Sequence, residues 1–266
     1  MSVEVAYPAA NQCIYCGATS YAVDSKRYLA EEHIIPFGLN GNVVIPRASC
    51  RRCERITGRT ESIVLKGSLL GCRTHLRLQT RLPKDRPKVL PLFDPTTTPN
   101  RKVMVDIADY PISLLLMQLD QPAILTRRAA DNSTSAVWSK LFRVDMETLR
   151  LKYGLSKIAT SSLDVHSFNR MLAKIAHSFA MAEQLAGRLS QFKPYLVQLI
   201  LDANGKTNWD MHVGGWLEAV PPSNKLHEIG IERPIERHEK LISVKIRLFA
   251  NLGAPVYRVI AGERIA

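Results

Sequence analysis

Four cysteines stand in two pairs whose spacing suits a bound metal ion. Cys13 and Cys16 lie in "NQCIYCGATS", and Cys50 and Cys53 lie in "ASCRRCERIT". Two residues between the members of a pair let both thiolates reach one tetrahedral Zn²⁺ from a tight turn. Cys72 is left over, so a disulfide framework fits poorly and a reduced cytoplasmic setting fits well. We expect a structural zinc site with four sulfur ligands.

The segment between the two cysteine pairs carries two residues with complementary chemistry. It contains "EEHIIPFGLNGN", in which Glu32 directly precedes His33. A carboxylate can hold a hard divalent cation, and a neutral imidazole can take a proton from an attacking water. The apolar pair after His33 predicts the end or start of a short strand, followed by a Gly/Asn-rich loop.

Together these motifs resemble the zinc-stapled HNH endonucleases. In that family a ββα-metal core often reads Asp-His-Ile-x-Pro or Glu-His-x-Ile-Pro between two C-x2-C pairs, and the resemblance covers about residues 11–65. It implies a treble-clef arrangement, with a β-hairpin that carries His33 and a helix after the last cysteine. It also implies hydrolysis of a phosphodiester with one catalytic Mg²⁺ or Mn²⁺.

The resemblance assigns roles to residues of the intervening segment. His33 would be the general base that activates water, and Glu32, in the place of the family's usual Asp, would be a ligand of the catalytic divalent ion. The family's central Asn orients the histidine. Here Asn40 and Asn42 stand in the corresponding loop, and we select Asn42.

The third motif position departs from the family pattern. An His or Asn usually follows the last cysteine, where this chain has Glu54. Glu54, or Glu61 further along, could supply an oxygen ligand to Mg²⁺ or Mn²⁺. A domain that kept its zinc fold but lost its catalytic metal would show the same substitution.

Basic residues predict contact with a polyanion. Lys and Arg outnumber Asp and Glu by 36 to 24, which gives a net charge of +12. Arg51, Arg55 and Arg59 are four apart, so on a helix they form one guanidinium ridge that can lie against phosphates. Aromatic residues are few nearby, which favours double-stranded DNA over a single strand. A solvated helix face would have the same pattern.

The rest of the chain predicts an α+β fold with a mostly antiparallel sheet in its C-terminal part. We divide the chain into a zinc-stapled HNH-like domain (1–82), a proline-rich connector (83–100) and an α+β domain of unknown role (101–266), through which a homodimer could form. The most regular helix is expected over 163–186. Strands are expected within 102–109, 121–128, 195–202, 211–220, 241–250 and 254–262. No apolar run is long enough to predict a membrane span.

Two other functions share most of these features. One is a catalytically inactive treble-clef module that binds DNA or RNA, and it differs from the nuclease only at Glu32 and His33. The other is a zinc-stabilised scaffold for a protein partner, for which the charge has no special role. Salt dependence separates the scaffold from the nucleic-acid binders, because binding to a phosphate backbone releases counterions.

Overall fold

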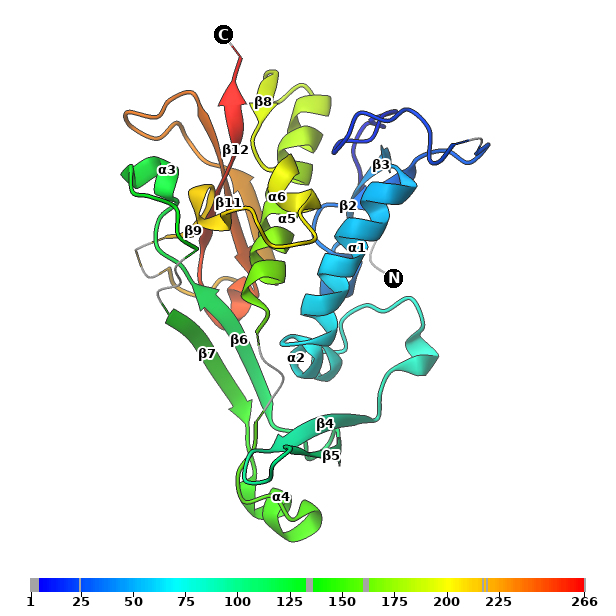
Figure 1. The fold of residues 1–266 in the computed structure, drawn as a ribbon, viewed down its shortest axis with the longest axis vertical. Coiled ribbons are helices and arrows are strands. Elements are labelled where there is room, and N and C mark those ends of the chain that lie inside the picture. Colours follow the sequence, from blue (N-terminus) through cyan, green and yellow to red (C-terminus); the bar gives the residue numbers. More distant parts are fainter. Residues whose placement is uncertain are drawn as a thin grey trace.

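The computed structural model describes residues 5–23, 25–132, 136–159, 163–216, 218 and 220–265. Its N-terminal part combines a small sheet, in the order β1-β3-β2, with two helices (Figure 1). Strands β2 and β3 pair antiparallel as a hairpin, and β1 lies parallel to β3. The elements are β1 (Val5–Ala6), β2 (Ala30–His33), the 3-10 turn η1 (Phe37–Leu39), β3 (Val43–Ser49), α1 (Arg51–Lys66) and α2 (Leu70–His75).

Helix α1 begins at the second cysteine pair for local reasons. Cys50 caps it in an extended conformation, and Glu54 in the first turn and Lys66 in the last turn complement the helix dipole. Gly67 ends the helix, as glycine near a helix terminus commonly does, and its N–H donates to the carbonyl of Ile63 at 2.9 Å. The predicted helix after the last cysteine is confirmed.

The proline-rich segment differs from the expected connector because part of it is a paired strand. Its residues include the 3-10 turn η2 (Pro83–Asp85) and β4 (Val89–Asp94), and β4 pairs antiparallel with β5 (Arg101–Asp106). A two-stranded ribbon tolerates Pro91, since each of its strands has a free edge. A second hairpin joins β6 (Ile112–Gln118) to β7 (Ala136–Arg143), with α3 (Ala123–Thr126) between them and α4 (Met146–Tyr153) after them.

Helix α5 (Val165–Leu185) packs against both α1 and the C-terminal sheet (Figure 1). Asp164 caps it by accepting a hydrogen bond from the N–H of Ser167 at 2.7 Å. The sheet has the order β10-β11-β12-β8, with antiparallel pairs, and β9 also pairs with β12. Its elements and the short helices around it are β8 (Phe192–Pro194), α6 (Val197–Leu201), η3 (Trp209–Met211), β9 (Val213–Gly215), β10 (His227–Ile231), β11 (Leu241–Leu248), η4 (Ala250–Leu252) and β12 (Tyr257–Arg264).

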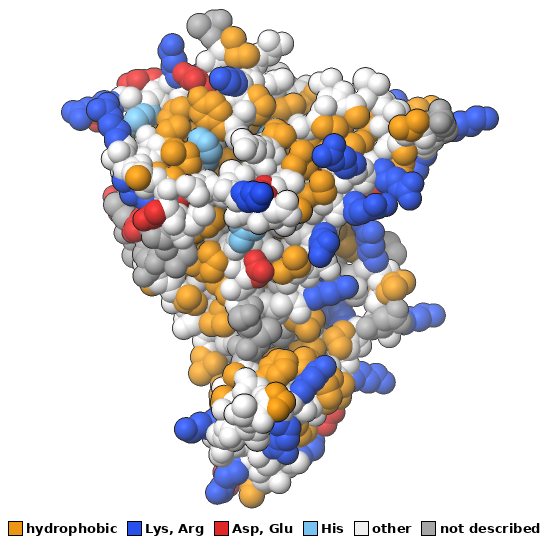
Figure 2. All heavy atoms as spheres, viewed as in Figure 1, with side chains coloured by type: hydrophobic (Ala, Val, Ile, Leu, Met, Phe, Trp, Pro, Cys, Tyr) orange, Lys and Arg blue, Asp and Glu red, His pale blue; other side chains and the backbone are white. Residues whose placement is uncertain are grey.

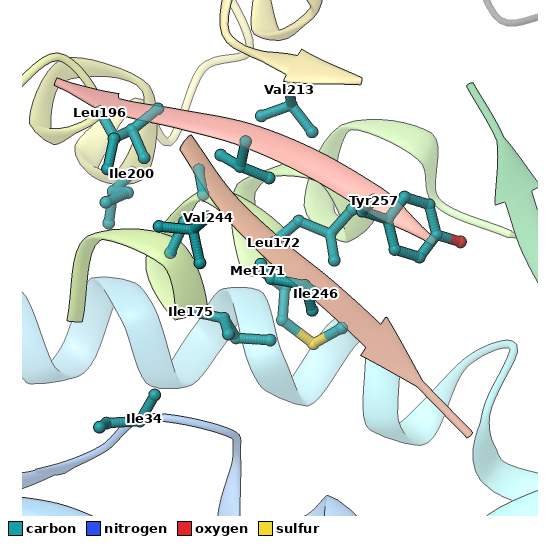
Figure 3. Close-up of a cluster of buried hydrophobic side chains, with 14 of the residues drawn as sticks. Ile34, Met171, Leu172, Ile175, Leu196, Ile200, Val213, Val244, Ile246 and Tyr257 are labelled. Carbon is teal, nitrogen blue, oxygen red and sulfur yellow. The ribbon is translucent and has the colours of Figure 1, made fainter. Parts of the chain in front are cut away.

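One hydrophobic core joins the N-terminal and C-terminal parts, which differs from the division at residues 83–100. It includes Cys13 and Ile34 beside Ile175 of α5 and Ile246 of β11, and Figure 3 shows the last three in one close-up. A smaller cluster lies around β4, β5 and α4. Among the described residues, the N-terminal segment therefore shares its hydrophobic core with the rest of the chain and packs on it through α5.

Two expected strands are helical. Residues 121–128 contain α3, where Pro122 fixes a backbone angle suited to the start of a helix. Residues 195–202 contain α6, whose final carbonyls at Leu199 and Ile200 accept hydrogen bonds from the buried Arg170. Short apolar runs cannot distinguish a strand from a buried helix. The strand expected over 211–220 is limited to β9 among the described residues, and positions 217 and 219 of that segment lie outside them.

Candidate metal centre and nucleic-acid interface

The four paired cysteines come together at one end of the hairpin and α1. Their sulfur atoms all lie within 4.8 Å of one another, and the Sγ atoms of Cys16 and Cys50 are 3.6 Å apart. Gly17, at φ +76°, turns the first pair, and its N–H donates to the carbonyl of Cys13 at 2.8 Å. The second pair comes from the N-cap and first turn of α1.

The chemistry of this cluster fits a closed site for a soft or borderline divalent metal ion. Sulfurs bound tetrahedrally to one Zn²⁺ stand about 3.8 Å apart, which follows from a Zn–S distance of about 2.3 Å. Hydrogen bonding from the Cys53 thiol, together with backbone N–H groups, lowers the pKa of Cys13 to about 4, so an anionic sulfur is favoured there. Cys72 is outside the cluster, and burial raises the pKa of its thiol to about 12.

His177 of α5 supports the cysteine turn from behind. Its ring is fully buried and stacks on Tyr15 with the centroids 5.4 Å apart. The Nε2 atom of His177 donates to the carbonyl of Ile14 at 2.8 Å, which lies between the first two cysteines. Helix α5 therefore fixes the backbone from which Cys13 and Cys16 project.

The predicted metal ligand Glu32 faces the protein interior. Its side chain is 7% exposed, and its Oε1 atom lies 2.6 Å from the Nζ atom of Lys174 on α5. Burial raises the pKa of Glu32 above its ordinary value, although the Lys174 ammonium opposes this. The Glu32 carboxylate is thus already occupied by a cation that belongs to the chain.

His33, the predicted general base, is half-buried at the end of β2. Its ring packs edge-on against Phe37 with the centroids 5.5 Å apart. Because neighbouring residues of a strand face opposite sides, the His33 imidazole and the Glu32 carboxylate do not share a face. The main-chain carbonyl of His33 accepts a hydrogen bond from Lys174.

The two candidate asparagines have different surroundings. Asn40 adopts a left-handed conformation at φ +63°, and its Oδ1 accepts a hydrogen bond from the N–H of Gln79 at 2.6 Å, so its amide fastens the loop. Asn42 is half-buried and lines a groove of about 500 Å³ with Tyr7 and Ile34. Its carbonyl accepts from the N–H of Val5 at 2.8 Å.

The structure separates Glu54 from Glu61. The Oε2 atom of Glu54 accepts a hydrogen bond from the Tyr21 hydroxyl at 2.8 Å near the cysteine end of α1. Glu61 stands two turns further, about 10 Å along the helix axis, and its Oε1 atom lies 2.9 Å from Lys174 Nζ. Among the described residues, the four cysteines are the one group of three or more metal-ligating side chains placed to share an ion. As the side chains stand, Glu32 and Glu54 do not fit a shared catalytic Mg²⁺ or Mn²⁺.

Lys174 is the residue of this site that the sequence analysis missed. The helix over 163–186 is predicted from its apolar residues alone, and Lys174 stands among them. A lysine within the run "MLAKIAHSFA" is the signal that could have found it, because a lysine is almost never fully buried unless it is paired.

The arginines of α1 form an exposed face. Arg51, Arg55 and Arg59 are all solvent-exposed, and Lys and Arg side chains gather over this part of the molecule in Figure 2. A groove of about 690 Å³ on one side includes Tyr21, Arg51 and Arg55 in its lining. A second groove of about 810 Å³ is lined by Arg55, Arg59 and Trp209, among others.

A second basic surface lies beside the proline-rich segment. A groove of about 680 Å³ there is lined by Arg77, Lys84, Arg86, Lys88 and Arg143, with no acidic residue in its described lining. Arg73 belongs elsewhere, because its guanidinium donates to the carbonyls of Gly38, Leu65 and Gln79 and so has a structural role. The α1 face and this groove therefore both present positive charge where a polyanion can reach it.

Comparisons with known proteins leave the chain without a match. No family model, no curated protein and no solved structure is similar to it at the level of significance required. Within the described part of the chain, no helix has the length and apolar character needed to cross a membrane.

Proposed function

We propose that this chain binds nucleic acid, with double-stranded DNA as the preferred form, through the basic face of a zinc-stapled, HNH-like module. The observation that carries the proposal is the exposed ridge of Arg51, Arg55 and Arg59 on the helix that begins at the cysteine cluster. Guanidinium groups on one exposed helix face can contact phosphates, and such contacts position a duplex without reading its sequence.

Zinc at Cys13, Cys16, Cys50 and Cys53 would have a structural task. A closed shell of four sulfurs leaves no open coordination position for a substrate. The ion would connect the turn before β2 to the first turn of α1, and so fix the ridge relative to the hairpin. Zinc binding and folding of this segment would then be coupled.

The direct test is binding of short fluorescent duplexes by the zinc-loaded chain, measured by anisotropy. The triple variant Arg51→Ala, Arg55→Ala, Arg59→Ala is compared with a control, Arg127→Ala, Arg150→Ala, Arg237→Ala, which removes the same charge from exposed arginines elsewhere. We expect the α1 variant to bind about tenfold more weakly or worse, and the control to change little. An equal loss of affinity in both variants would mean that the net charge of the chain governs binding and that the α1 face has no special role. Single-stranded DNA and RNA of equal length test the preference for duplex.

Hydrolysis is a second candidate function. The observation that favours it is His33, a half-buried imidazole at the end of β2 in the Glu-His-Ile-Ile-Pro segment. Plasmid nicking with added Mg²⁺, Mn²⁺ or neither, by the wild type and by His33→Ala at equal zinc content, separates the two candidates. Metal-dependent nicking that disappears in the folded variant would make the chain an HNH-type endonuclease. Binding without nicking would leave the first proposal standing alone.

A further inference from the structure

The side chain of Lys174 ends in a cage of oxygen atoms. Its Nζ atom lies 2.6 Å from Oε1 of Glu32 and 2.9 Å from Oε1 of Glu61, and it donates to the carbonyl of His33. The Ile34 carbonyl oxygen is 3.5 Å away. The lysine side chain is 2% exposed, so water contributes little to this arrangement.

These oxygens come from the β2 region and from α1, and the ammonium comes from neither of them but from α5. Glu32 and the two carbonyl groups belong to β2 and the turn after it, and Glu61 belongs to α1. Two carboxylates and two carbonyls form the kind of oxygen set that hard divalent ions prefer. Here the ammonium of Lys174, which belongs to α5, lies among these oxygens in the place of a metal ion.

A divalent ion cannot join this set while the ammonium is present. It would compete for the same carboxylate oxygens, and the ammonium beside it would repel it through a medium of low dielectric constant. Glu32 and Glu61 in turn compensate the charge of the lysine, because their Oε1 atoms lie 2.6 Å and 2.9 Å from its Nζ atom.

We propose that Lys174 is an internal cation that takes the place of a divalent metal ion between β2 and α1. The wild-type chain then has no bound Mg²⁺ or Mn²⁺ at Glu32, and helix α5 is the element that excludes it. Removal of the lysine head group opens a site for a hard divalent cation, with Glu32, Glu61 and the carbonyl of His33 as its ligands. This inference is independent of whether the α1 face binds nucleic acid, which the arginine variants test.

The experiment measures binding of Mn²⁺ alone to zinc-loaded protein, by the electron paramagnetic resonance signal of free Mn²⁺. Four chains are compared: the wild type, Glu61→Gln, Lys174→Ala, and the double variant Lys174→Ala with Glu61→Gln. We expect no Mn²⁺ binding that depends on Glu61 in the wild type. Lys174→Ala should bind Mn²⁺ at least tenfold more tightly than the double variant, and Mn²⁺ should raise its melting temperature.

Two results would overturn the proposal. One is Mn²⁺ binding by the wild type that Glu61→Gln abolishes, because a metal would then share the carboxylates with Lys174. The other is a folded, zinc-containing Lys174→Ala chain that binds Mn²⁺ no better than the double variant. If Lys174→Ala does not fold, the comparison of the wild type with Glu61→Gln still decides, since Glu61 is the more exposed carboxylate, at 20%, and tolerates the change better. Absence of Glu61-dependent binding there supports the proposal.

Discussion

Replacement of Lys174 by methionine should destabilise the protein strongly. Methionine retains the apolar stem of the lysine but removes the charge that balances Glu32 and Glu61. Lys174 and Glu32 have side chains only 2% and 7% exposed, so the carboxylate left behind is almost fully desolvated. Loss of one partner from a buried ion pair costs about 3–5 kcal/mol. We expect a loss in this range in the free energy of unfolding at pH 7.

The pH dependence distinguishes lost charge compensation from poor packing. Burial already raises the folded-state pKa of Glu32 above its ordinary value, and removal of the ammonium takes away the main opposing influence. An acid whose folded pKa is raised stabilises the fold below its unfolded pKa and loses that contribution as the pH rises through the folded pKa. The defect of Lys174→Met should therefore shrink as the pH falls from 7 toward 4.5.

Urea unfolding of zinc-loaded protein at pH 5 and pH 7 measures both effects. The double variant Lys174→Met with Glu32→Gln serves as the control, because a buried neutral amide has no charge to compensate. It should recover more than half of the loss at pH 7. A single variant within about 1 kcal/mol of the wild type at pH 7, or a defect that does not change with pH, would refute the reasoning.

Four further predictions concern the zinc site, a buried histidine and two glycines. Chelation of the metal or Cys53→Ser should unfold the N-terminal segment and lower the zinc content, whereas Cys72→Ser should retain zinc; both are measured by metal analysis and circular dichroism. Burial lowers the pKa of His227 to about 4, so the neutral imidazole stabilises the fold fully above pH 6.5. This contribution to the free energy of unfolding is lost as the pH falls toward 4, by up to about 3 kcal/mol. A free energy of unfolding that stays constant over this pH range would contradict the prediction. Gly58→Ala on the exposed side of α1 should stabilise by about 0.5–1 kcal/mol, since its new methyl group meets no atom within 4 Å. Gly41→Ala should destabilise the protein, because its methyl group would stand 1.8 Å from the carbonyl oxygen of Ile35. A melting temperature that rises in this variant would contradict the described conformation of the loop.

Local signals account for the parts of the fold and site that the sequence could predict. The spacing of the cysteines and the turn at Gly17 depend on neighbours in the chain, and so do the start of α1 at Cys50 and the apolar face of α5. The four sulfurs meet as expected. Helix α5 lies within the range predicted for it, and β11 and β12 lie within or beside the expected runs.

The features that the sequence could not predict depend on long-range packing. Lys174 of α5 meets Glu32 of β2 and Glu61 of α1 only because segments far apart in the sequence pack together, and no local pattern encodes these pairings. The apolar run at 195–202 contains α6, and the carbonyls of Leu199 and Ile200 near its end accept hydrogen bonds from Arg170, a partner from a different helix. The prolines of residues 83–100 describe the local chain only, so they could not predict the shared hydrophobic core that includes Cys13 and Ile246.

The salt dependence of duplex binding by zinc-loaded protein tests the central claim most directly. The logarithm of the binding constant is plotted against the logarithm of the salt concentration for the wild type, the Arg51, Arg55 and Arg59 triple variant, and the matched control. If the α1 ridge contacts phosphates, the wild type shows a steep negative slope, and the triple variant loses about three units of it while the control keeps it. No binding, or equal slopes in the wild type and the triple variant, would contradict the claim that this face holds nucleic acid.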